Sequence, residues 1–262
     1  MIYLFSAAGL EELGRFVSQD TLFAFDLDGT LAPIIADPGS IAIAPDVRRH
    51  LIDLHRSAPL AIITGRARAD ASKHLGFTPG FLAGNHGAEG LPGCQASEEE
   101  YVRLCRDWKL QLLDFLPDPN GIVIEEKGAT LALHYRNSPN PEQAHKEILL
   151  AIDRLTPTPR AVAGILVENI TPKDAPNKGD ALLSIMRFLA CTRAVFFGDD
   201  VTDEDVFRLR DDRVLGIRIG MDPRSAATCY LHDQNETDTA ISHIIKLLGQ
   251  AGEINHNNGT GV

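Results

Sequence analysis

Two aspartates separated by one residue, Asp26 and Asp28, stand where an apolar segment, 23–25, runs into a glycine turn. Such a segment is typical of a buried strand, and residues two apart in an extended chain project to the same side. Two carboxylates so close repel each other unless a cation or a shared proton compensates them. The pair therefore predicts a divalent cation bound by oxygen ligands. The alternative interpretation is an acidic turn that only ends the strand.

A second acidic group follows another apolar segment. Residues 194–197 form a buried-strand candidate that also ends in aspartates, Asp199 and Asp200, and Asp203 comes shortly after them. A lone acidic turn is common, but two apolar strands that both end in aspartates indicate one shared metal site.

Groups suited to phosphate lie between and after these segments. The strand candidate 59–63 leads to Thr64 and Arg66, whose hydroxyl and guanidinium suit phosphate oxygens. Lys178 opens an apolar helical pattern, and anions are favoured near a helix N-terminus. Each of these residues alone is more often a surface group, so their combination carries the prediction.

Strand and helix patterns alternate along the first part of the chain and again near its end. Alternation of this kind predicts an α/β fold, a Rossmann-like, doubly wound parallel sheet with helices on both faces. In such sheets ligands bind at the carboxyl ends of the strands, where the groups above are expected. The first helical patterns cover 10–18, 45–56 and 68–75, and the first strand patterns cover 21–26, 60–64 and 81–83.

The organisation changes after residue 93, where long helical patterns and a hairpin-like strand pair appear between Pro- and Gly-rich segments. We interpret 94–171 as an inserted α+β cap domain; a continuous core with a long decoration is the alternative. The core then consists of 1–93 and 172–248. The tail 249–262, rich in Asn and Gly, is expected to be disordered.

Composition narrows the function classes. The chain has 262 residues and a formal net charge of −11, which argues against a nucleic-acid partner. It contains no apolar run long enough to span a bilayer, so no membrane partner is expected. Its four cysteines lack metal-site spacing, which favours reduced thiols in a cytoplasmic protein.

The motifs Asp-x-Asp-Gly-Thr, Thr-Gly-Arg, Lys-Gly and Gly-Asp-Asp occur in this order and resemble the haloacid dehalogenase superfamily of phosphohydrolases. Within it, the chain resembles trehalose-6-phosphate phosphatases in six segments: 25–34, 84–89, 125–128, 133–136, 177–179 and 198–204. The resemblance implies hydrolysis of trehalose 6-phosphate, a small sugar phosphate, to trehalose and phosphate. It also implies a functional link to a trehalose-6-phosphate synthase.

The resemblance assigns roles to the core residues. Asp26 is expected to be the nucleophile that forms an aspartyl-phosphate, and Asp28 the general acid and then the general base. Mg²⁺ is expected to bind the Asp26 carboxylate, the Asp28 backbone carbonyl and Asp199.

Further roles concern the phosphoryl oxygens and the surroundings of the metal. Thr64 and Lys178 are expected to hold the phosphoryl oxygens. Asp200 and Asp203 are expected to orient the metal ligands or the lysine.

The substrate is expected to contact residues of the core and the cap, which are Arg66, His86, Glu125, Lys127, Arg136 and Glu168. For the charged cap residues the alternative is a solvated strand face, and for His86 it is a turn histidine. His134 and Trp108 are expected to be packing residues.

Three functions therefore remain open. The first is a trehalose-6-phosphate phosphatase, and the second is a phosphatase for another phosphorylated glycoside, such as sucrose phosphate or a glycosylglycerol phosphate. The third is a non-catalytic sugar-phosphate binding protein on the same fold.

Overall fold

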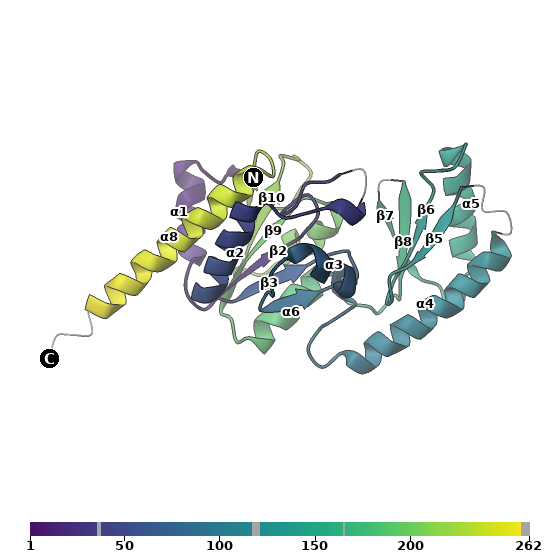
Figure 1. Ribbon diagram of the computed structural model, residues 1–262, viewed down its shortest axis with the longest axis horizontal. Coiled ribbons are helices and arrows are strands. Elements are labelled where there is room, and N and C mark those ends of the chain that lie inside the picture. The colour runs from purple at the N-terminus through teal and green to yellow at the C-terminus, as the bar shows by residue number, and fades with distance from the viewer. Residues whose placement is uncertain (36–37, 117–120, 165, 258–262) are drawn as a thin grey trace. The chain divides into compact units, whose positions relative to one another are not determined.

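The computed structural model describes residues 1–35, 38–116, 121–164 and 166–257 (Figure 1). The chain divides into two compact units. The core unit comprises Met1–Gly87 and Asn177–Val262, and the cap unit comprises Ala88–Pro176. Each unit contains its own sheet, so each is described by itself.

The core unit is built on a seven-stranded sheet in the order β1-β11-β10-β9-β2-β3-β4, in which every strand pair is parallel. From β2 the chain adds strands toward β4, and from β9 it adds them in the other direction. The order therefore reverses between β2 and β9, which is where an α/β sheet forms its ligand crevice. The predicted doubly wound α/β core is confirmed. The strands are β1 (Ile2–Tyr3), β2 (Thr21–Phe25), β3 (Leu60–Ile63), β4 (Phe81–Ala83), β9 (Arg193–Gly198), β10 (Val214–Ile219) and β11 (Cys229–Leu231).

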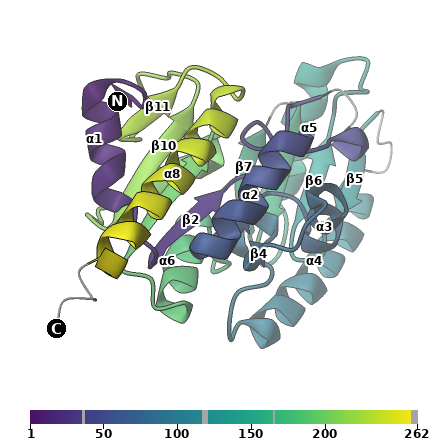
Figure 2. The same cartoon turned by 60° about the vertical axis from the view of Figure 1, so that its left-hand side comes forward.

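Helices cover both faces of this sheet because its strands are apolar on both sides. Phe23 and Phe25 point to one face and join a buried cluster with residues of α2 and α8, which lie side by side in Figures 1 and 2. Phe196 points to the opposite face and packs against Phe207 of α7, with ring centroids 5.9 Å apart. The helices are α1 (Ala7–Phe16), α2 (Pro45–Ser57), α3 (Arg68–Leu75), α6 (Lys178–Phe188), α7 (Glu204–Phe207) and α8 (Glu236–Asn257), with 3₁₀ turns η1 (Pro38–Ser40), η2 (Asn85–Gly87) and η3 (Val201–Asp203).

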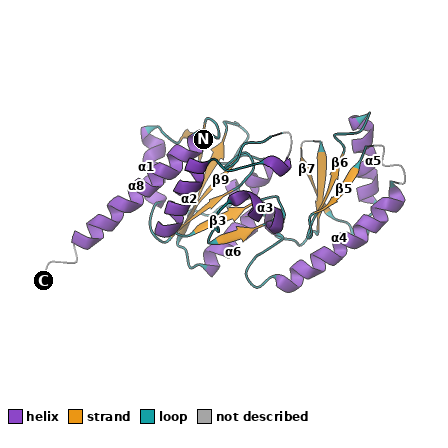
Figure 3. Ribbon diagram, viewed as in Figure 1, coloured by secondary structure: helices purple, strands orange, loops and turns teal. Residues whose placement is uncertain are grey.

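The cap unit contains a four-stranded antiparallel sheet in the order β5-β6-β8-β7, with two long helices (Figure 3). Leu131, Leu133 and Ile170 point to one face, where they form a buried cluster with Trp108 of α4 and Ile148 of α5. One face of the sheet is therefore covered by helices. The elements are α4 (Gln95–Phe115), β5 (Val123–Glu126), β6 (Leu131–His134), α5 (Pro141–Asp153), β7 (Arg160–Gly164) and β8 (Val167–Thr171).

The cap unit extends beyond the 94–171 segment expected from the sequence. Ala88 and Ala175 lie outside that segment, yet both pack with Tyr101 and Ala129 in a small buried cluster. Proline- and glycine-rich segments mark where the chain turns, whereas buried contacts decide which unit a residue joins.

The end of the chain also differs from the expectation of a disordered tail over 249–262. Helix α8 continues to Asn257, and residues 258–262 lie outside the described residues. Adding a residue to an existing helix costs far less than starting one, so the turns before 249 support those that follow. Among the described residues, no helix is both long and apolar enough to cross a membrane.

Ile148 and Leu150 offer a test of the cap core, because both lie on α5 but only Ile148 is buried, at 0% exposure against 65% for Leu150. Ile148→Ala should lower the free energy of unfolding of the cap unit by about 2–5 kcal/mol through lost burial and a residual cavity. Trp108 is the only tryptophan of the chain, so urea unfolding followed by its fluorescence reports on this unit. Leu150→Ala, the matched control, should change stability by less than about 0.5 kcal/mol. Equal losses of unfolding free energy in the two variants would contradict the assignment of Ile148 to the buried face of α5 and Leu150 to its exposed face.

Candidate active site

Three neighbouring strands bring the predicted core residues to one edge of the sheet. Phe25 at the end of β2 pairs with Ile62 of β3 on one side and with Phe197 of β9 on the other. Because the strands are parallel, Asp26, Thr64 and Asp199, which follow them directly, emerge at the same carboxyl edge. The site therefore lies where the strand order reverses.

Asp26, Lys178 and Asp203 form a buried group of charges. The Lys178 ammonium, 1% exposed, lies 3.0 Å from Asp26 Oδ2 and 2.6 Å from Asp203 Oδ1. Burial alone lowers the pKa of Lys178, but the charges of Asp203 and Asp26 outweigh burial and raise this pKa. The lysine therefore stays charged between two carboxylates.

Lys178 is positioned by the start of α6. Asn177 caps this helix: its side chain accepts a hydrogen bond from the Asp180 N–H, and Asp180 accepts one from the Asn177 N–H. This capping box fixes where the helix begins. Lys178 is consequently held as the first helical residue.

Carboxylate oxygens of Asp26, Asp199 and Asp203 lie within 4.8 Å of one another and could hold a cation. Asp26 Oδ1 is buried and has no hydrogen-bond partner among the described residues. Burial raises the pKa of Asp26 well above its ordinary value, and burial followed by the charge of Asp203 raises the pKa of Asp199 to about 7. A divalent cation would compensate this crowded negative charge, so the donor set fits a hard, oxygen-liganded metal.

Asp203 differs from the other two carboxylates because both of its oxygens are engaged. Oδ1 accepts from Lys178, and Oδ2 accepts from the backbone N–H groups of Asp199 and Asp200, each at 2.8 Å. Asp203 thus links the lysine to the loop after β9. Asp26 and Asp199 are left as the carboxylates best placed to face a cation.

Thr30 and Gly29 are site residues that the sequence analysis did not single out, although both belong to the Asp-x-Asp-Gly-Thr motif. The buried Thr30 hydroxyl donates to Asp199 Oδ1 at 3.1 Å. Gly29 has a φ of +79°, and a Cβ at this position would overlap the Asp199 carboxylate. The turn after Asp28 therefore needs a glycine so that Asp199 can approach.

Thr64 is buried after β3, and its hydroxyl accepts the Arg66 N–H at 3.2 Å. His86, in the 3₁₀ turn η2, lies against Gly65, where a side chain would overlap its imidazole ring. The His86 N–H donates to the Thr64 carbonyl at 2.9 Å. His86 therefore lies against the Thr-Gly-Arg turn.

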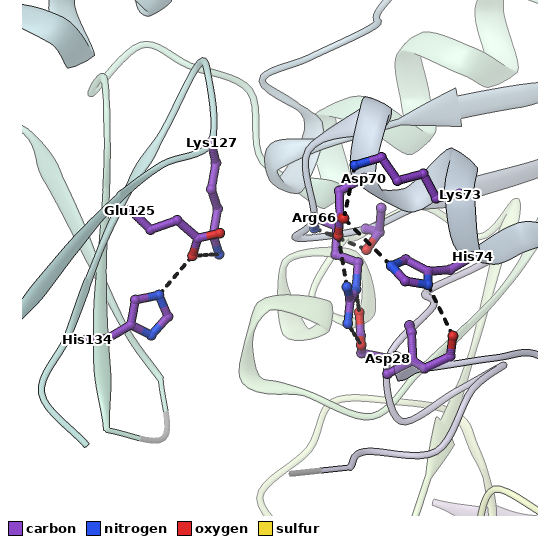
Figure 4. A network of polar contacts seen from close by, with 10 residues as sticks. Asp28, Arg66, Asp70, Lys73, His74, Glu125, Lys127 and His134 are labelled. Atoms are coloured by element: carbon purple, nitrogen blue, oxygen red, sulfur yellow. Dashed lines mark hydrogen bonds and ion pairs between the residues drawn. The ribbon is translucent and has the colours of Figure 1, made fainter. Parts of the chain in front are cut away.

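Arg66 holds Asp28 rather than standing free for an anion (Figure 4). Its Nε and Nη2 groups donate to the two Asp28 carboxylate oxygens, each at 2.7 Å, and Nη1 donates to Asp70 at 2.8 Å. The sequence predicted that Arg66 contacts phosphate. In the structure its fork-shaped guanidinium matches two carboxylates.

In the cap unit, Glu125 of β5 joins His134 of β6 and Lys127 (Figure 4). His134 Nε2 lies 2.8 Å from Glu125 Oε2, and Lys127 Nζ lies 3.9 Å from the same oxygen. His134, which was expected to be a packing residue, is thus half-exposed and polar in its contacts. Arg136 is exposed in the turn after β6.

Glu168 does not belong with this group. It pairs in register with Leu133, which faces the helix-covered core, and its Oε1 lies 2.8 Å from His145 of α5. Glu125 and Asn169 instead both pair with Ala132, so they share the face that α4 and α5 do not cover. Glu168, which was expected to contact the substrate, therefore lies on the other face of the sheet from Glu125, because neighbouring residues of a strand point to opposite faces.

Comparisons with known proteins decide the family. The sequence model of the trehalose-phosphatase family matches residues 24–225. A protein of Sinorhizobium fredii named "Probable trehalose-phosphate phosphatase" is 34% identical over 209 residues, which cover 76% of each chain. The chain belongs to the trehalose-phosphatase family. The family predicted from the motifs is thereby confirmed.

Other members of the trehalose-phosphatase family extend the comparison. A trehalose-phosphate phosphatase of Mycobacterium tuberculosis is 28% identical over 211 residues, covering 77% of this chain and 54% of the relative. The chain thus spans about half the length of this relative. A solved trehalose-6-phosphate phosphatase related protein has the same fold, with a TM-score of 0.72, 22% identity, and coverage of 88% of this chain and all of that one.

In this member of the trehalose-phosphatase family, replacing the buried Lys178 should lower the free energy of unfolding. Lys178→Met leaves Asp26 and Asp203 buried without their cation, so we expect the free energy of unfolding to fall by about 3–5 kcal/mol in EDTA. Lys146→Met, which removes an exposed pair with Glu142, is the control and should cost less than about 1 kcal/mol. Urea unfolding followed by far-UV circular dichroism measures both. A Lys178 variant as stable as its control would show that the carboxylates are neutral in the folded state.

Proposed function

We propose that this chain is a phosphatase that hydrolyses trehalose 6-phosphate to trehalose and phosphate. The observation that carries the proposal is the buried Asp26–Lys178–Asp203 group beside Asp199 at the carboxyl edge of the sheet. It supplies a nucleophile, a cation for phosphoryl oxygens and carboxylates for a metal. Membership of the trehalose-phosphatase family supports the choice of substrate.

In the first half of the reaction, Asp26 attacks phosphorus in line with the leaving sugar oxygen. Lys178 Nζ lies 3.0 Å from Asp26 Oδ2, which holds this carboxylate in place for the attack. The P–O bond to the sugar breaks as an aspartyl-phosphate forms. Lys178 and the Thr64 hydroxyl stabilise the negative charge on the phosphoryl oxygens.

Asp28 handles the protons in both halves of the reaction. Asp28 starts protonated and donates its proton to the departing sugar oxygen; as a carboxylate it then accepts a proton from the water that hydrolyses the aspartyl-phosphate, which returns it to its starting form. Arg66 donates to both oxygens of Asp28, and this supports the proposal because it holds the Asp28 side chain in one orientation.

We propose Mg²⁺ as the metal, bound by Asp26, Asp199 and the Asp28 backbone carbonyl. A bound divalent ion neutralises charge on the phosphoryl group and on the carboxylates. Asp200 and Asp203 are proposed to position these ligands and Lys178, and the two hydrogen bonds from the loop after β9 to Asp203 support this.

For the sugar, we propose contacts from Glu125, Lys127 and Arg136, which are charged groups suited to hydroxyls, and a place for His86 near the phosphate. Another phosphorylated glycoside would use the same core chemistry, so only these cap residues discriminate between substrates. The four cysteines are free thiols, which supports a cytoplasmic enzyme, supplied with substrate by a trehalose-6-phosphate synthase.

The first test is phosphate release from trehalose 6-phosphate, sucrose 6-phosphate and glucose 6-phosphate, with Mg²⁺ and with EDTA. We expect Mg²⁺-dependent release from trehalose 6-phosphate, and a loss of at least about a thousandfold in kcat for Asp26→Asn because the covalent route is removed. Asp46→Asn, an exposed control on α2, should retain wild-type activity.

The outcomes separate the three candidate functions. Preference for another ester keeps the mechanism and overturns the substrate. No release from any ester by a folded protein that binds Mg²⁺ favours a non-catalytic sugar-phosphate binding protein.

The raised pKa of Asp199, about 7, predicts pH-dependent metal binding. A cation competes with the proton, so below this pKa the apparent affinity for Mg²⁺ should fall by about tenfold per pH unit for each proton displaced. Above it the affinity should level off. Isothermal titration calorimetry between about pH 5.5 and 8.5 measures this. Asp199→Asn should bind more weakly with a flatter pH dependence, whereas a pH-independent wild type would contradict protonation of the metal-free site.

A further inference from the structure

We propose that Asp70 is a positioning residue: it holds the Arg66 guanidinium so that Arg66 fixes the carboxylate of Asp28. The inference rests on the proposed function, in which Asp28 transfers the protons. It assigns a role to α3, a helix that supplies none of the residues expected to touch substrate or metal.

The geometry is a chain of three side chains (Figure 4). Arg66 Nε donates to Asp28 Oδ2 and Nη2 donates to Asp28 Oδ1, both at 2.7 Å. On its other edge, Arg66 Nη1 donates to Asp70 Oδ2 at 2.8 Å. The Arg66 side chain is only 13% exposed, so these bonds are partly shielded from water.

The Asp70 carboxylate is needed because the bidentate pair between Arg66 and Asp28 does not by itself fix the orientation of the Asp28 side chain. A guanidinium bound only to Asp28 could swing together with that carboxylate as one plane. The Arg66 backbone is already held, since its N–H donates to Thr64 and its carbonyl accepts from Asn85 at 2.8 Å. The bond to Asp70, one helical turn further on, therefore removes the remaining freedom of the side chain.

Two basic side chains of its own helix lie near Asp70, both beyond hydrogen-bond distance. Its Oδ1 lies 3.6 Å from His74 Nε2 and 3.9 Å from Lys73 Nζ. His74 Nδ1 lies 3.1 Å from the Ile41 carbonyl, which can only accept, so this nitrogen carries the hydrogen. Burial alone raises the pKa of Asp70, but the hydrogen bond and charge of Arg66 outweigh burial and lower it, so the anchor stays ionised.

The consequence concerns one chemical event. As Asp26 forms its bond to phosphorus and the ester P–O bond breaks, the proton that Asp28 carries in its acid form moves to the departing sugar oxygen and leaves Asp28 as a carboxylate. The Arg66 fork occupies one lone pair on each Asp28 oxygen and leaves others for this proton. A misdirected Asp28 should therefore slow the loss of an alkoxide, but not the loss of a leaving group that needs no proton.

The test compares kcat/KM for trehalose 6-phosphate with kcat/KM for p-nitrophenyl phosphate, whose nitrophenolate leaves unprotonated. For Asp70→Asn we expect a fall of about tenfold or more on the sugar ester and less than about threefold on the aryl ester. Arg66→Lys keeps the charge but loses the fork, and should show the same selective fall. Asp70→Glu, which retains the carboxylate, should restore part of the loss. Asp53→Asn, which removes an exposed pair with Arg56 on α2, is the matched control and should change neither value.

An equal fall on both esters, or no fall on either, would overturn the role of Asp70. Thermal unfolding shows whether Asp70→Asn is folded. If it is not, the kcat/KM values of Arg66→Lys for the two esters test the proposal instead. A wild-type protein that releases no phosphate from trehalose 6-phosphate would instead refute the proposed function. If the wild-type enzyme is active and the variants keep its ratio of kcat/KM for the two esters, only the positioning role is refuted.

Discussion

The core unit buries one ammonium between two carboxylates at the carboxyl edge of its sheet. Lys178 bonds to Asp26 and Asp203, and all three side chains are withdrawn from water. Isolated charges would not tolerate this burial, so strand β2, the start of α6 and the loop after β9 must be placed together with high accuracy. Asn177 caps α6, and the backbone N–H groups of Asp199 and Asp200 bind Asp203, which secures that placement.

The same burial leaves the site short of positive charge. Asp26 and Asp199 remain with raised pKa values despite the nearby lysine, because desolvation and neighbouring carboxylates both favour their neutral forms. A divalent cation would compensate this excess of negative charge. Carboxylates with raised pKa values are typical of functional sites, because a bound cation stabilises their charged forms.

Two features of the structure separate groups that are close in the sequence. Asp26 and Asp28 are two residues apart, yet one faces Lys178 and the other is held by Arg66, which lies just before α3. Glu168 and Asn169 are neighbours, yet one packs with His145 under α5 and the other shares a face with Glu125. In each pair the two residues are close in the sequence, but their side chains have different partners and therefore different surroundings.

Apolar periodicity and motif order depend on local residue types, so the α/β class, most element positions and the set of core groups could be predicted from the sequence. The partners of these groups follow from the three-dimensional arrangement: Arg66 pairs with Asp28 and Asp70, and Thr30 donates to Asp199. The same arrangement also decided the extent of the cap, through the packing of Ala88 and Ala175. Hydrogen bonds and strand register join residues far apart in the chain, and a one-residue change of register reverses the face of a side chain, so no local pattern could predict them.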